Sequence, residues 1–209
     1  MQRKIRNWLA MLTLTFFTIL MVKITIPYLS LERDVAFLKI KQWMIQNDIW
    51  RFSFFTHVFS SVFLLLAGFT QFYKPLNRKI HRSIGKIYII LIVFISGPAG
   101  LVMSWFANGG LPSQTAFVLL SILWIFFTAK AYSAIRNKDF ISHGNFMIRS
   151  YALTISAITL RSWKYLLVLF FHPHPMDAYM MVAWLGWVPN LLIAELLIRN
   201  RMSNKILST

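Results

Sequence analysis

The chain of 209 residues contains no cysteine and only six acidic residues, against 22 lysines and arginines. The absence of cysteine excludes disulfides, thiolate metal sites and thiol nucleophiles. It leaves histidine as the ligand type for a transition metal or for haem iron. The motifs H-E-x-x-H and G-x-S-x-G and a phosphate-binding loop are also missing from the sequence. The chain therefore carries none of the signatures of zinc proteases, α/β-hydrolases or P-loop enzymes.

Charged residues make up only 13% of the chain, whereas 57% of the residues are hydrophobic. The hydrophobic residues form six blocks, each long enough to cross a bilayer as a helix. These blocks cover about residues 8–29, 52–73, 84–106, 115–134, 146–171 and 177–198. The connections between them are too short for a separate soluble domain. We therefore predict an all-α integral membrane protein with six transmembrane helices in one bundle, forming a single membrane domain over residues 1–209 with a short basic tail over 199–209.

The net charge of +16 is distributed unevenly along the chain. If the six helices alternate in direction, fifteen of the 22 basic residues fall on one side of the membrane. The opposite connections are poor in lysine and arginine, apart from the first one, over residues 30–51. This distribution follows the positive-inside rule and predicts that both termini are cytoplasmic. The charge is thus explained by orientation and by contact with anionic lipid head groups, and it does not indicate nucleic acid binding.

The segment R-S-Y-A-L-T-I-S-A-I-T-L-R, residues 149–161, places a cation within the fifth hydrophobic block. Small and basic residues recur there at intervals of four, three, four and three, which is the spacing of one helical face. They are Ser150, Thr154, Ala157, Arg161 and Lys164. Because a guanidinium at membrane depth is costly, Arg161 is expected to face the bundle interior, a water-filled cavity or a bound group.

The predicted topology places His57, Arg161, Lys164 and Lys23 together in the outer half of the membrane. The face of His57 continues along the second block through Ser61, Leu64, Gly68 and Gln71. Gly68 leaves a slot there for another helix or a flat ligand. The outer cluster has no acidic neighbour within the membrane, since Glu195 lies near the inner end of the sixth block and is expected to pair with Arg199, four residues later.

Two interpretations of this unbalanced positive charge remain open. The missing partner is a bound anion, such as a haem propionate, a lipid phosphate or an acidic substrate. Alternatively, Lys164 and Lys23 extend to the outer interface, and Arg161 donates to backbone carbonyl groups freed by a kink at Pro98. Asn190 in the sixth block either joins helices or contacts a ligand, and the former is favoured.

Three segments of the chain resemble a family of bacterial predicted membrane proteins, domain of unknown function 2306. They are H-V-F-S-S-V-F-L-L-L-A-G-F-T-Q-F (57–72), R-K-I-H-R-S-I-G-K-I-Y (78–88) and the stretch from D-F-I-S-H-G-N-F-M-I-R to Arg161 (139–161). The resemblance covers about residues 50–200. It implies a multi-helix membrane fold in the bacterial cytoplasmic membrane, and it implies no established activity. It gives weight to His57, Gln71, His81, Arg82, Gly85, His143, Arg149 and Arg161.

A looser resemblance is to the two-haem transmembrane cytochromes of the b type, which have six spans and axial histidines on a central bundle. Here His81 and His143 begin the third and fifth spans on the same side. This placement suits a bis-histidine haem b, with Arg82, Lys86 or Arg149 holding the propionates. The chain departs from the pattern because its fourth span has no histidine to pair with His57. The alternatives are interfacial histidines that bind loop carbonyls or lipid phosphates, another metal, or a proton relay.

The sequence therefore leads to two functional hypotheses. In the first, the protein is a redox protein that binds haem through His81 and His143 and exchanges electrons with a quinone or a soluble partner. In the second, it is a non-redox membrane module that binds or moves an anionic lipid or a small acid near His57, Arg161 and Lys164.

Overall fold

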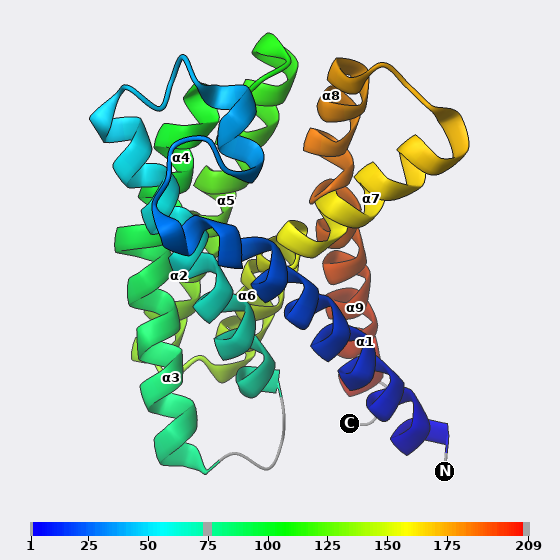
Figure 1. Cartoon of the computed structure of the whole chain (residues 1–209). Coiled ribbons are helices and arrows are strands. Elements are labelled where there is room, and N and C mark those ends of the chain that lie inside the picture. The colour runs from blue at the N-terminus through cyan, green and yellow to red at the C-terminus, as the bar shows by residue number, and fades with distance from the viewer. Residues whose placement is uncertain (1, 73–76, 207–209) are drawn as a thin grey trace.

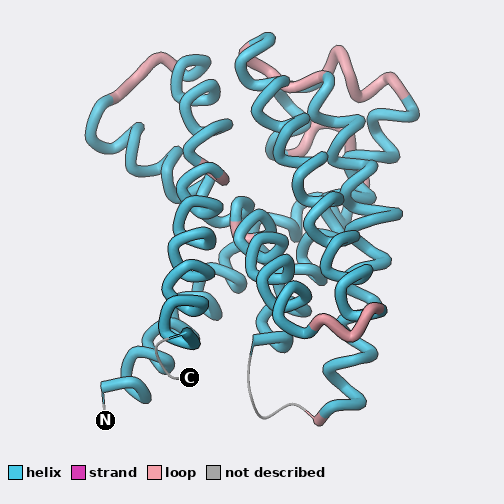
Figure 2. The backbone as a smooth tube through the Cα atoms, turned by 180° about the vertical axis from the view of Figure 1, so that it is seen from behind, coloured by secondary structure: helices cyan, strands magenta, loops and turns pink. Residues whose placement is uncertain are grey.

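The computed structural model describes residues 2–72 and 77–206, and the side chains of all of these except 2–11, 14, 69–72 and 201–206. Within these ranges the chain folds into helices connected by short loops and contains no strand (Figures 1 and 2). The elements are α1 (Gln2–Thr25), η1 (Ile26–Ser30), η2 (Ala36–Lys41), α2 (Asp48–Phe72), α3 (Arg78–Ile90), η3 (Leu91–Ser96), α4 (Gly97–Trp105), α5 (Gly110–Arg136), α6 (Phe140–Thr154), α7 (Ser156–Phe171), α8 (Pro175–Leu185) and α9 (Val188–Ile206).

Four helical segments are long and apolar enough to cross a membrane: Asp48–Gly68, Arg78–Trp105, Gly110–Arg136 and Pro175–Asn200. The pair α6 and α7, bent by 40° at its break, gives a fifth if it is counted as one span. The described apolar part of the first segment, Thr15–Ser30, is shorter. The helical membrane fold is therefore as predicted, while the count of six spans stays a prediction.

Side-chain caps fix where several of these helices begin. Asn47 Oδ1 accepts a hydrogen bond from the Trp50 amide at the start of α2. The Asn77 and Asp139 side chains accept backbone hydrogen bonds at the starts of α3 and α6. These residues satisfy amide groups that have no partner inside the helix. The caps therefore fix the residue at which each of these three helices begins.

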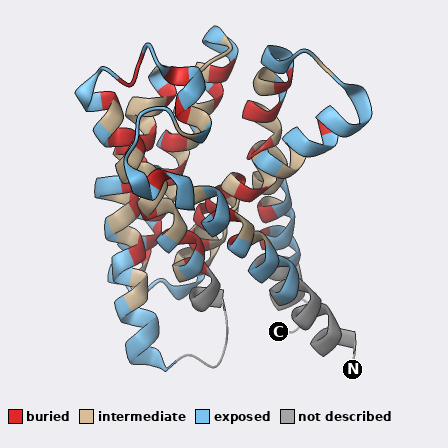
Figure 3. Ribbon diagram, viewed as in Figure 1, coloured by how far each residue is buried: buried red, intermediate tan, exposed pale blue. Residues whose placement is uncertain are grey.

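A buried hydrogen-bond network joins α3, α5 and α6 inside the bundle. The Tyr88 hydroxyl lies 2.8 Å from Thr154 Oγ1 and 3.1 Å from Ser150 Oγ. Trp124 Nε1 donates to Thr154 Oγ1 over 3.0 Å, and Thr128 Oγ1 lies 2.7 Å from Ser150 Oγ. Figure 3 shows buried residues concentrated where these helices face one another. Two members of the polar stripe predicted from sequence, Ser150 and Thr154, thus have a structural role.

The tight packing in this region also closes the slot predicted at Gly68. A Cβ atom at this position would lie 1.9 Å from a ring carbon of Tyr151, so the aromatic ring occupies the space that glycine leaves. The slot therefore accommodates a side chain of α6 and is not open to a flat ligand.

The start of α1 and the end of α9 lie at the same end of the molecule as the start of α3, on the opposite side of the bundle (Figure 1). Exposed basic residues lie at this end, at the start of α3, at the end of α5 and in the turn that follows α5: Arg78, Lys79, Arg136 and Lys138. The segment with η1 and η2 lies at the opposite end, where it packs over the outer parts of α2 and α4. Its core contacts include Leu38, Ile45, Trp50 and Phe54. The arrangement agrees with the predicted topology; the cytoplasmic placement of the termini stays a prediction.

Two helix breaks face each other deeper in the bundle. α6 ends at Thr154 and α7 starts at Ser156, while α8 and α9 are separated at Gly186. Asn190 Nδ2 lies 3.2 Å from the Ala152 carbonyl oxygen, 3.2 Å from the Gly186 carbonyl oxygen and 2.9 Å from Thr159 Oγ1. A donor is thereby supplied to carbonyl groups at both breaks, as an apolar surrounding requires. Asn190 therefore joins helices, as the sequence favoured.

The predicted orientation is testable by cysteine labelling, because the native chain has no cysteine. Asp34→Cys lies in the exposed segment before η2, and Asn137→Cys lies in the exposed turn between α5 and α6. In intact spheroplasts, we expect a membrane-impermeant maleimide to label the variant at position 34 and to leave the one at position 137 unlabelled until the membrane is opened. The reverse pattern would show that the termini are outside.

The Asn190→Leu variant tests the link between the two breaks. The loss of its hydrogen bonds leaves backbone carbonyl groups without a donor, so the variant should be destabilised by about 1–2 kcal/mol. Thermal unfolding in detergent should show this as a lower midpoint. The control is Leu192→Ala on the same helix, where the side chain is 61% exposed and its removal should have little effect. Equal midpoints for Asn190→Leu and the wild type would contradict a joining role.

Candidate functional site

A cavity of about 240 Å³ lies between the helices toward the end opposite the chain termini, and we call it the outer cavity. Its walls come from α1, η2, α2, α4, α5, α7 and α8 and from the residues next to the break after α6. Most lining side chains are apolar, and three basic ones also line it: Lys41, His57 and Arg161. No aspartate or glutamate is among the described residues that line it.

His57 comes from α2 and is held against the third span. Its Nδ1 atom lies 2.9 Å from the Ser96 carbonyl oxygen, at the end of the π-helical segment η3. A carbonyl only accepts, so Nδ1 carries the proton and Nε2 is the nitrogen that remains for a ligand. The ring fits because residue 100 is glycine: a Cβ there would lie 3.0 Å from His57 Nδ1.

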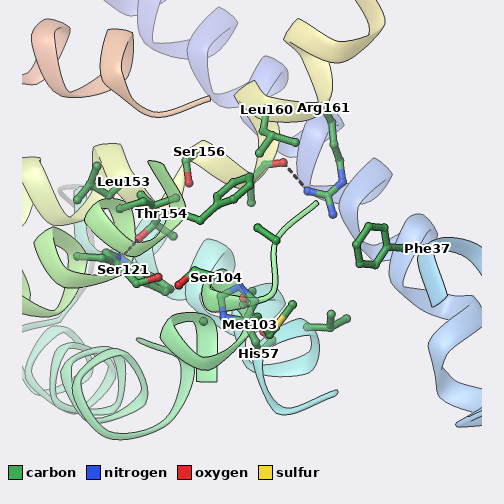
Figure 4. A pocket seen from close by; sticks show the side chains of 18 of the residues that line it. Phe37, His57, Met103, Ser104, Ser121, Leu153, Thr154, Ser156, Leu160 and Arg161 are labelled. Atoms are coloured by element: carbon green, nitrogen blue, oxygen red, sulfur yellow. Dashed lines mark hydrogen bonds between the residues drawn. The ribbon is translucent and has the colours of Figure 1, made fainter. Parts of the chain in front are cut away.

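Arg161 comes from α7, two turns after the break that follows α6. Its Nη1 atom donates to the Ala157 carbonyl oxygen over 2.6 Å. In Figure 4 the side chain extends from α7 toward Phe37, and His57 lies further along the cavity wall. Arg161 as a whole residue is exposed, and it lines the outer cavity. The carbonyl that it binds belongs to its own helix and not to the segment around Pro98. In that segment the Ser96 carbonyl, two residues before Pro98, is bound by His57.

Lys41 completes the basic group and was not predicted. It is the last residue of η2 and is 1% exposed. Its Nζ atom donates to the Phe106 carbonyl oxygen and lies 5.1 Å from the centroid of the Trp43 ring. Burial lowers the pKa of Lys41 from 10.5 to about 8. The one sequence signal was its place in the first connection, the exception to the positive-inside distribution.

Of the two other residues predicted for this site, Lys164 does not line the outer cavity, and the place of the Gln71 side chain stays a prediction. Lys164 lies exposed on α7, one turn beyond Arg161, and is absent from the described lining. The predicted stripe continues across the break, since Thr154 and Ala157 also line the cavity. Lys164 follows Arg161 by three residues on the same helix, so its side chain is turned by about 60° from that of Arg161 and lies further along α7. Gln71 lies in the last turn of α2, and its side chain is outside the described residues.

The residues predicted on the cytoplasmic side are only partly brought together. His81 and His143 lie close enough for their charges to interact. His143 Nδ1 lies 2.8 Å from the Ala131 carbonyl oxygen, so its Nε2 atom remains for another group. His81 and Arg82 are exposed near the start of α3.

Arg149 is occupied by a different partner. Its Nε atom donates to Glu195 Oε1 over 2.5 Å and its Nη2 atom to Oε2 over 2.8 Å. The guanidinium also lies over the rings of Phe127 and Phe146, 5.8 and 5.4 Å from their centroids. The hydrogen-bonded partner of Glu195 is therefore Arg149, while Arg199 interacts with it through its charge. Packing of α6 against α9 brings a bidentate partner that the spacing along one helix does not reveal.

The comparisons with known proteins agree with the resemblance seen in the sequence. A family model described as "Predicted membrane protein (DUF2306)" matches residues 54–198. No curated protein and no solved structure matches the chain. The match spans the helices from α2 to α9, including His57 and Arg161, and leaves Lys41 outside. The chain thus belongs to the DUF2306 family of predicted membrane proteins.

Proposed function

We propose that this protein binds an amphipathic anion in the outer cavity. The observation that carries the proposal is the charge of the lining: Arg161 and Lys41 face a largely apolar space, and no described acidic residue lines it. Arginine does not lose its proton in proteins, so its positive charge persists whether or not a partner is present. A bound anion supplies the missing charge.

The hydrogen bonds of Arg161 support the same conclusion. A guanidinium carries five N–H donors, and the one contact found among the described residues uses Nη1 for the neutral Ala157 carbonyl. A carboxylate or phosphate accepts two parallel hydrogen bonds from such a group, and these charge-assisted bonds are roughly twice as strong as neutral ones. The other N–H groups of the guanidinium therefore remain to donate to an anionic head group.

The rest of the lining suits a short apolar body. Aromatic and aliphatic side chains form most of the wall, including Leu65, Met103, Phe117, Leu120 and Leu153. The volume of about 240 Å³ is below the range of about 300–1,000 Å³ typical of drug-sized ligand pockets. It favours a single-chain ligand with one head group over a two-chain lipid. Carboxylate and phosphate head groups share this chemistry, so the experiment must separate them.

Substitution of Arg161 tests the proposal, with Lys164 as the matched control on the same helix. The protein in nanodiscs of zwitterionic lipid is titrated with octanoate and with octyl phosphate, and the fluorescence of Trp50 and Trp124 in the cavity wall reports binding. We expect Arg161→Gln to weaken binding by roughly 10- to 100-fold, since hydrogen bonds to charged groups contribute about 1.5–3 kcal/mol. Lys164→Gln should leave the affinity unchanged because Lys164 does not line the cavity.

The two probes separate a carboxylate from a phosphate ligand, since the natural class should bind more tightly. Equal affinities in the wild type and Arg161→Gln, with both proteins folded, would contradict the proposal. A loss in Lys164→Gln alone would move the site to the surface of α7.

A second proposal, haem binding through His81 and His143, is supported by the hydrogen bond of His143. A metal-ligating histidine commonly donates its other ring N–H to a backbone carbonyl, which is the contact seen between Nδ1 and Ala131. The fit is incomplete, because Arg149 is bound by Glu195, so propionate binding falls to Arg82 and Lys86. A haem held in this way would supply one-electron redox chemistry.

An optical spectrum after haem-replete expression tests this second proposal. If it holds, the purified protein should show a Soret band, and His143→Ala should abolish the band while the protein still folds. His172→Ala, at an exposed loop position, is the control. A colourless wild-type protein would exclude haem ligation by this pair.

A further inference from the structure

Lys41 approaches the outer cavity from outside the membrane-spanning segments. It ends η2, which packs over the outer parts of α2 and α4, and its side chain reaches inward to the same space that Arg161 lines from α7. Two cations from distant parts of the chain thus line one cavity. Lys41 lies outside the matched family region, so the family model does not account for it.

The contacts of Lys41 leave its charge uncompensated. The Phe106 carbonyl and the Trp43 ring are both uncharged, although each interacts favourably with an ammonium group. The other titratable groups of the cavity wall are His57 from α2, Arg161 from α7 and Tyr179 from α8, and none of them is acidic near neutral pH. A carbonyl that accepts from an ammonium group is readily exchanged for an anionic oxygen, because the charged pair is the stronger one.

We infer that Lys41 is the second cationic group that binds the anion, and that ligand binding at the outer cavity is therefore linked to the protonation of this lysine. The inference rests on the proposed function and extends it: Arg161 provides a permanent charge, whereas Lys41 provides one that pH can remove. The protonated lysine binds the anion, and the neutral lysine binds it weakly.

The direction of the pH dependence follows from linkage. Burial lowers the pKa of Lys41 to about 8 in the free protein, and a bound anion stabilises the ammonium form and raises the pKa again. A proton is therefore taken up on binding near pH 8, and the affinity falls as the pH rises above that value. Arg161 stays charged throughout, while tyrosine and histidine ordinarily titrate outside the range from pH 7 to 9.

The test compares the dissociation constant of octanoate at pH 7 and pH 9 in nanodiscs. Octanoate is chosen because its carboxylate stays ionised over this range. In the wild type we expect binding to be about tenfold weaker at pH 9 than at pH 7, as for the loss of one proton. Lys41→Met should bind weakly and equally at both values, whereas Lys41→Arg should bind equally at both values with higher affinity than Lys41→Met. Lys39→Met, an exposed lysine two residues earlier on η2, is the matched control and should behave as the wild type.

The outcomes separate this inference from the proposed function. If octanoate binds and Arg161→Gln weakens it, but the wild-type affinity is the same at both pH values, the role of Lys41 is overturned and the anion site stands. The role of Lys41 is likewise overturned if Lys41→Met keeps the tenfold pH effect. If octanoate does not bind the wild type at pH 7, both the anion site for this class of ligand and the role of Lys41 are overturned. The wild-type pH profile and Lys41→Arg decide the matter even if Lys41→Met does not fold.

Discussion

Hydrogen bonds from side chains to backbone carbonyl groups hold this fold together at the points where its helices depart from regular geometry. In an apolar surrounding a carbonyl without a donor is costly, and an interrupted helix exposes several of them. His57 donates to the Ser96 carbonyl at the end of the π-helical segment, and Asn190 donates to the Ala152 carbonyl close to the break after α6. At each of these interruptions, a polar side chain from another helix supplies the donor.

The same interaction explains why the outer cavity carries charge. Arg161 and Lys41 also donate to carbonyl groups, those of Ala157 and Phe106. A carbonyl satisfies an N–H donor but leaves the positive charge of the group unchanged. Cationic donors that bind neutral carbonyl groups thus lie at the cavity wall, and their uncompensated charge is the basis of the proposed anion binding. The residues predicted on the cytoplasmic side differ in this respect, because the charge of Arg149 is neutralised by Glu195.

Hydropathy predicted the helical membrane fold, because it is a property of long stretches of sequence, whereas the orientation drawn from the charge bias stays a prediction. Four of the helical segments are long and apolar enough to cross a membrane, as the hydrophobic blocks indicated. His57 and Arg161 were found because a polar or charged residue at membrane depth needs a structural or functional reason. Both line the outer cavity.

The errors have definite physical causes. Lys164 was placed with Arg161 by helical spacing, but a residue three positions further along α7 is turned by about 60° from Arg161 and lies exposed beyond the described lining. Lys41 lies on a short 3₁₀ helix in a connection, where neither hydropathy nor periodicity marks a buried side chain. The partner of Glu195 depends on how α6 and α9 pack, and the spacing along α9 alone pointed to Arg199. Asn190, by contrast, was correctly assigned, since an amide within a span joins helices more often than it binds ligands.

The facing helix breaks near Ile155 and Gly186 divide this side of the bundle into an outer pair of helices and an inner pair. α7 packs on α8 in the outer pair, and α6 packs on α9 in the inner pair. Thr159 and Asn190 join the two pairs, since Thr159 Oγ1 donates to the Gly186 carbonyl oxygen over 2.5 Å and accepts from Asn190. Any tilt of the outer pair therefore moves Arg161 and strains the hydrogen bonds of Thr159 and Asn190. The strength of these hydrogen bonds therefore limits how far the guanidinium of Arg161 can move.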